Sequence, residues 1–151
     1  MLWGLKYSSG EDVTANPEEA IHWFQKAAAL GNVKESRAKA RYERGIVCSN
    51  GKGTAKDDAE AVVWWRKAAE QNFALAQNNL GVMYDNGAAV AADRVEAYFW
   101  FNLSLAGTLP PDIHNSAQKS RDDPAAQLSQ TALMELQERC RKWQEEHRAA
   151  E

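Results

Sequence analysis

The sequence predicts an all-α solenoid, a superhelix of helix-turn-helix repeats that ends in capping helices. Three similar stretches carry this prediction, and they begin at Asn16, Asp57 and Asp93, which stand 41 and then 36 residues apart. Each has an alanine four positions later and a tryptophan seven positions later. Such a period is typical of stacked helical hairpins, in which each unit buries its apolar face against its neighbour. A chain of 151 residues is long enough for one such domain.

The first helix of a repeat is clearest in the third copy. Ala76, Leu80 and Tyr84 recur at four-residue spacing and therefore share one helical face. Asn86-Gly87 is expected to end this helix, because glycine readily adopts the left-handed backbone of a helix stop.

The corresponding helix of the second copy is predicted to be longer by five residues, because the repeat spacing is 41 residues before Asp57 and 36 after it. Arg44 stands in this helix where the third copy has Leu80. Its long side chain is expected to bury its stem and carry its charge outward.

The second helix of each copy begins with a capping signal. Asn16, Asp57 and Asp93 are predicted N-caps that accept hydrogen bonds from the first turn. A glutamate three residues after each cap is expected to reach back to it. Pro17 follows the first cap, at a position where a helix tolerates the missing N–H.

Trp23, Trp64 and Trp100 occupy one position of the repeat. Small residues nearby are expected to let helices approach closely, so the three indoles are predicted to form a buried packing layer. A cofactor-binding cluster of tryptophans is the less favoured alternative.

The end of the chain departs from the repeat. Leu109-Pro-Pro-Asp-Ile is predicted to start a pair of capping helices, separated at Asp122-Asp-Pro. Ser129 is a predicted N-cap of a last helix that runs to about His147. The predicted inner face of that helix carries Leu133, Leu136, Cys140 and Trp143.

These boundaries predict repeats over residues 1–107 and a cap over residues 108–151. The copies are expected at about 1–31, 32–72 and 73–107. The first is truncated, because Met1–Tyr7 matches only the back half of a first helix. Its open apolar edge is expected to meet a preceding repeat or a second copy of the chain, which would make a homodimer.

Composition narrows the function and the location. A net charge of −3 gives no general attraction to nucleic acid. No run of about 20 apolar residues predicts a membrane span, and no secretion signal is visible, so we expect a soluble chain in the cytoplasm or the periplasm. Cys48 and Cys140 have no metal-ligand spacing and are expected to be small buried hydrophobes, with a disulfide between them the minor alternative.

The repeat resembles the Sel1-like repeat family, a relative of the tetratricopeptide repeats. The matching residues of the third copy are Ala76, Leu80, Gly81, Tyr84, Gly87, Val90, Asp93, Ala97 and Trp100. The Lys-Ala-Ala ending is present at Lys26 and Lys67. The tail from Ala117 to Trp143 is similar to the C-terminal cap of bacterial members. The resemblance implies an α/α superhelix that acts as an adaptor in protein complexes.

If the helices stack as the resemblance implies, the first helices line the concave face, and this face is the predicted partner-binding surface. Leu5, Ile46 and Val82 share one repeat position, and all three are apolar. We expect this apolar line to hold a peptide within a polar margin. The alternative is that the three side chains pack against the adjacent first helix. The margin is formed by Lys39, Tyr42, Ser49, Leu75, Asn78 and Asp85.

The remaining motifs give little evidence for a specific function. Gly45–Thr54 has one spacer residue too many for a phosphate-binding loop, and no strand precedes it. The basic residues from Lys34 to Arg44 go round the helix with acids between them, so they indicate a solvated helix. His22, His114 and His147 are scattered and form no catalytic motif.

The sequence therefore predicts a non-enzymatic adaptor without a cofactor or a metal. It is expected to bind a protein or peptide on its concave face. The alternative is a cell-envelope hydrolase or ligand-binding protein of the same repeat family, which a pocket of converging ionisable groups would favour.

Overall fold

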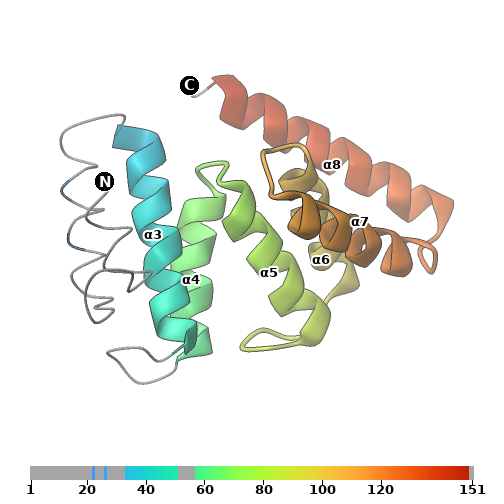
Figure 1. The fold of residues 1–151 in the computed structure, drawn as a ribbon. Helices are drawn as coiled ribbons and strands as arrows, with labels where there is room; N and C mark the ends of the chain where they lie inside the picture. Colours follow the sequence, from blue (N-terminus) through green and yellow to red (C-terminus); the bar gives the residue numbers. More distant parts are fainter. Residues whose placement is uncertain (1–21, 23–25, 27–32, 51–56, 150–151) are drawn as a thin grey trace. The chain divides into compact units, whose positions relative to one another are not determined.

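A computed structural model describes residues 22, 26, 33–50 and 57–149, which form helices and turns without any strand (Figure 1). This confirms the all-α prediction. The chain divides into two compact units, residues 1–71 and 72–151. Asn16, Pro17, Trp23 and the open edge at Met1–Tyr7 lie outside the described residues.

The first unit contains the helical pair α3 (Val33–Asn50) and α4 (Asp58–Ala69), which pack against each other. Helix α3 has 18 residues, whereas its counterpart in the next repeat, α5 (Ala74–Asn86), has 13. The predicted five-residue extension is confirmed. The buried residues of α4 include Ala61, Ala68 and Ala69, which are completely buried.

The second unit is built round α6 (Arg94–Leu105), which contacts α5, α7 (Pro111–Ala125) and α8 (Gln130–Ala149). Helix α6 carries apolar residues on nearly all sides, as expected for a helix with neighbours on several faces. Its buried residues are Ala97, Tyr98, Phe99, Trp100, Phe101, Leu103 and Ser104.

Both capping aspartates hold their helices as predicted. Asp93 Oδ1 accepts from the backbone N–H groups of Val95 (2.9 Å) and Glu96 (3.1 Å), and Asp57 Oδ1 accepts from that of Glu60 (3.0 Å). Gly87, with a φ of 68°, ends α5 in the expected left-handed conformation.

The prediction that the glutamate side chain accepts a hydrogen bond from the backbone N–H of the cap residue is wrong. The backbone N–H of Asp57 donates to the carbonyl of Cys48 (2.8 Å), and that of Asp93 donates to the carbonyl of Tyr84 (3.0 Å). Cys48 and Tyr84 are repeat equivalents at the end of the first helix. The first helix thus takes the donor that the glutamate was expected to bond, and Glu60 and Glu96 bond other groups.

The predicted burial of the tryptophan layer is confirmed at Trp100 but not at Trp64. The aromatic that enters each hairpin is the next residue, Trp65 in α4 (3% exposed) and Phe101 in α6 (1% exposed). Trp64 is only half-buried, whereas Trp100 is buried. The two indoles therefore have different environments, because helix α8 reaches Trp100.

The capping helices follow the prediction except at their junction. Helix α7 continues through Asp122, Asp123 and Pro124 to Ala125, so the predicted break there is wrong. Proline removes a backbone donor but lies in the final turn, where little helix remains to be broken. Ser129 Oγ accepts from the N–H of Ala132 (3.2 Å) and caps α8 as predicted.

Candidate partner-binding surface

The candidate residues of the first unit lie on one side of α3. Lys39, Tyr42, Ile46 and Ser49 are spaced by three or four residues and so line one helical face. All four are partly exposed, whereas Ala38, Gly45 and Cys48 of the same helix are buried. Part of each of the four side chains is therefore accessible on this unit.

The candidate residues of the second unit repeat this arrangement on α5. Leu75 and Asn78 are partly exposed, and Val82 and Asp85 are exposed. Val82 has 38% of its surface accessible. Leu80 and Gly81, next to Val82, are buried against the hairpin. Leu5, the ninth predicted residue, lies outside the described residues.

Two hydrogen bonds hold the α3 row, which consists of Lys39, Tyr42, Ile46 and Ser49, in place. Trp65 Nε1 donates to the carbonyl oxygen of Tyr42 (3.3 Å), which ties the middle of α3 to α4. Ser49 Oγ donates to Asp58 Oδ1 (3.4 Å) at the far end of the row. The backbone of α3 and one side chain of the row are therefore both bonded to α4.

Charge near the α3 row is mixed. Burial raises the pKa of Glu43, and the positive charge of Lys39 acts in the opposite direction. A lysine one helical turn before a glutamate places opposite charges side by side. This agrees with the expectation that the basic residues of α3 do not form a single basic face.

A cation–aromatic cluster at Trp64 was not predicted from the sequence. The Arg44 guanidinium lies 4.4 Å from the ring centroid of Trp64. The Lys67 ammonium lies 4.6 Å from the same centroid, and Trp64 Nε1 donates to Glu60 Oε1 (3.3 Å). The spacing of Trp64 and Lys67, three residues apart in one helix, is the sequence signal for the second contact.

The structure also describes the two cysteines and part of the segment that was compared with a phosphate-binding loop. Cys48 and Cys140 are both buried free thiols. The segment Gly45–Thr54, which has one spacer residue too many for a phosphate-binding loop, is described as far as Asn50. Its described part belongs to α3. Within residues 22, 26, 33–50 and 57–149, no group of His, Cys, Asp or Glu could hold a metal ion, and no helix is long and apolar enough to cross a membrane.

A family model described as the Sel1 repeat matches residues 2–32, 38–73 and 74–113. The chain belongs to the Sel1 repeat family. The matches include most of α3, all of α4, α5 and α6, and the start of α7. The chain is therefore a Sel1 repeat scaffold, and this family is defined by a repeat rather than by a reaction.

Two solved structures are similar to this Sel1 repeat chain. One is a Sel1 repeat protein from Oxalobacter formigenes, with 30% identity and a TM-score of 0.59 over 80% of this chain and 83% of that one. The other is c5321, a protective antigen of uropathogenic Escherichia coli strains with an SLR fold. It is 27% identical with a TM-score of 0.61, over 95% of this chain and 37% of that one.

A curated relative is chitin synthase regulatory factor 3 of Schizosaccharomyces pombe, which is 38% identical over 78 residues. These residues are 52% of this chain and 8% of the yeast protein. The chain thus spans a small part of the length of this relative.

Proposed function

We propose that this Sel1 repeat chain is an adaptor that binds a peptide or protein through the exposed rows of its first helices. The row on α3 comprises Lys39, Tyr42, Ile46 and Ser49, and the equivalent row on α5 comprises Leu75, Asn78, Val82 and Asp85. The observation that carries the proposal is the repeated exposure of apolar side chains at equivalent positions. Ile46 and Val82 remain accessible although each neighbours a glycine that is buried in its hairpin.

The composition of the row suits a peptide ligand. Apolar side chains supply contact area, and the amide of Asn78 can both donate to and accept from a peptide backbone. The relative from fission yeast is named for a regulatory role, which is the kind of role that an adaptor has.

The experiment compares two double variants of the full chain in a peptide-array binding assay. Ile46→Glu with Val82→Glu places charges in the row, and we expect binding to fall at least about tenfold because apolar contacts are replaced by charges that must be desolvated. Val63→Glu with Val95→Glu is the control, because Val63 (50% exposed) and Val95 (38% exposed) lie on the second helices.

Circular dichroism must show that both double variants keep their helices. Binding that survives the row variant in the folded protein would contradict the proposal. So would an equal loss in the control, because it would assign the effect to net charge rather than to the first helices.

A further inference from the structure

Helix α8 covers one face of α6 through a small set of side chains. Arg139 Nη1 donates to Glu96 Oε1 (2.5 Å), and its guanidinium lies 3.9 Å from the ring centroid of Phe99. The rings of Trp143 and Trp100 meet edge to face, with centroids 6.3 Å apart. Arg139 and Trp143 stand four residues apart and thus form one docking face of α8.

The face of α6 that α8 covers contains a buried indole N–H without a hydrogen-bond acceptor in the described part of the chain. Trp100 is 4% exposed, and its indole Nε1 has no hydrogen-bond acceptor among the described residues. At the equivalent position of the other repeat, Trp64 Nε1 donates to Glu60, one turn earlier. Glu96 occupies the place of Glu60, but its carboxylate bonds to Arg139 instead. At this repeat position the carboxylate thus bonds to α8 in the second unit and to the indole in the first.

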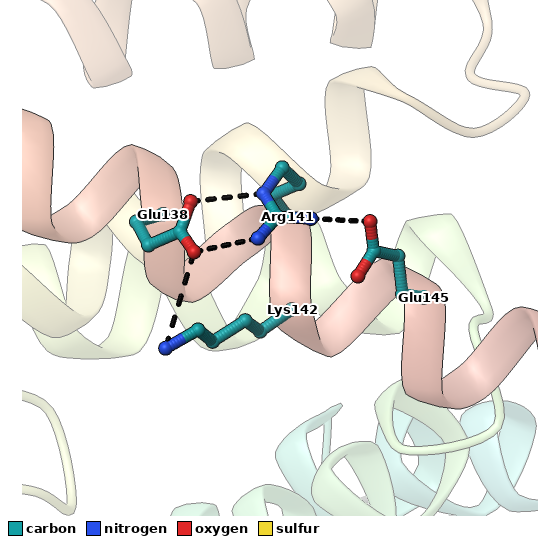
Figure 2. A network of polar contacts seen from close by, with 4 residues as sticks. All are labelled: Glu138, Arg141, Lys142 and Glu145. Atoms are coloured by element: carbon teal, nitrogen blue, oxygen red, sulfur yellow. Dashed lines mark hydrogen bonds and ion pairs between the residues drawn. The ribbon is translucent and has the colours of Figure 1, made fainter.

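Helix α8 also has support that does not depend on α6. Arg141 bonds to Glu138 (2.6 Å) and to Glu145, and Lys142 lies 3.9 Å from Glu138 (Figure 2). Pairs at three- and four-residue spacing stabilise a helix by themselves. Because these contacts are internal to α8, they persist when the helix leaves α6.

We propose that the face of α6 formed by Glu96, Phe99 and Trp100 is a helix-docking surface that α8 covers reversibly, and that it fits a partner helix with a basic residue four positions before an aromatic one. Such a helix reproduces the contacts of Arg139 and Trp143. When α8 lifts, Glu96 turns to the indole of Trp100. This surface lies on a second helix, so it does not depend on the function proposed for the first helices.

The reversible cover is tested by the rate at which N-ethylmaleimide alkylates Cys140 in the full chain. Cys140 is 2% exposed, and burial raises the pKa of its thiol, so alkylation requires that α8 lift. Arg139→Gln removes both contacts of that side chain and should speed alkylation roughly tenfold. Arg139→Lys should restore much of the slow rate.

Arg141→Gln is the matched control, because it removes an arginine from the outward network of the same helix. We expect its effect on Cys140 to stay within about twofold. Peptide mapping by mass spectrometry separates Cys140 from Cys48. An unchanged rate in Arg139→Gln, or an equal acceleration in Arg141→Gln, would overturn the reversible cover.

The movement of Glu96 is tested by the indole N–H signals of 15N-labelled tryptophan, with Trp100 assigned by Trp100→Phe. In Arg139→Gln the Trp100 signal should move downfield as its N–H gains the Glu96 acceptor, and Glu96→Ala in that background should abolish the shift. A Trp100 signal that stays in place in Arg139→Gln would show that Glu96 does not turn.

The docking surface is tested with a fluorescein-labelled peptide of residues 130–149 that carries Cys140→Ser. The full chain with Arg139→Gln and Trp143→Ala, shown to be helical by circular dichroism, should bind this peptide saturably. It should bind the same peptide with Arg139→Gln and Trp143→Ala at least about tenfold more weakly. The unmodified chain should bind weakly, because its own α8 competes at high local concentration. Absence of binding to the variant, or equal binding of both peptides, would overturn the proposal.

Discussion

Gly45 and Trp65 meet at a distance that only glycine allows, since a Cβ at Gly45 would lie 2.3 Å from Trp65 Nε1. Gly81 and Phe101 repeat the relationship in the second unit, where a Cβ would lie 2.7 Å from the Phe101 ring. In both described hairpins the first helix thus offers a bare stretch of backbone to the aromatic of the second helix. This contact fixes the inner side of the helix and leaves Ile46 or Val82 on its outer side.

Replacement of Gly81 by alanine should destabilise the chain. The new methyl group meets a ring that is 1% exposed and has little room to move, which costs about 1–3 kcal/mol, although alanine regains some helix propensity. We expect the free energy of unfolding in urea to fall by about 1–2 kcal/mol. Adding Phe101→Leu should make room for the methyl group, so the double variant should lose less than the sum of the single losses. Stabilisation by Gly81→Ala would contradict the close contact.

Loss of the Asp93 cap should weaken the start of α6. Its carboxylate accepts two backbone N–H bonds, so Asp93→Ala should lower the free energy of unfolding by about 1 kcal/mol. Asp93→Asn keeps an acceptor and should lose only a fraction of this amount. Urea unfolding followed by circular dichroism measures both variants, and equal losses would contradict a capping role for the side chain.

The cations at Trp64 should contribute to the first unit. Arg44→Met keeps much of the apolar stem but removes the charge over the ring, and we expect a loss of about 0.5–1 kcal/mol in the free energy of unfolding. Arg37→Met is the control, because Arg37 is exposed on the same helix. Its unfolding should change by less than about 0.3 kcal/mol, as is usual for a surface site. Similar losses in the two variants would indicate that the ring contact contributes nothing specific.

The buried thiols should make the chain less stable in alkali. Burial raises the pKa of Cys140 above its ordinary value of 9.0, so the folded state keeps the proton at a pH where the unfolded state has lost it. The stabilising contribution is complete below about pH 9 and is lost as the pH rises toward the folded-state pKa. Urea unfolding at pH 7 to 10 should show this fall.

Cys140→Ala isolates the thiol from other groups that titrate in alkali. Its free energy of unfolding should fall less steeply above pH 9 than that of the unmodified chain. Parallel pH profiles of the two proteins would contradict a raised pKa for Cys140 in the folded state.

Local signals predicted much of the fold. The aspartate caps at Asp57 and Asp93, the helix stop at Gly87 and the longer α3 depend on neighbouring residues and on repeat spacing. They were predicted for that reason.

Tertiary contacts were harder to predict. Trp64 and Trp100 share a repeat position, but their burial differs because only Trp100 has α8 as a neighbour. The entry of Trp65 and Phe101 into the hairpins depends on the facing glycines, which a single helical pattern does not reveal. The contact of Arg139 with Glu96 joins residues 43 positions apart, so no local spacing predicts it.

The most direct test of the central claim, that partners bind along the first helices, is site-specific photo-crosslinking. A photoreactive amino acid is placed at Ile46 or Val82, and in matched chains at Val63 or Val95, with a peptide selected on the array as the probe. We expect crosslinks from positions 46 and 82, and few or none from positions 63 and 95. Crosslinks that form mainly from positions 63 and 95 would contradict it.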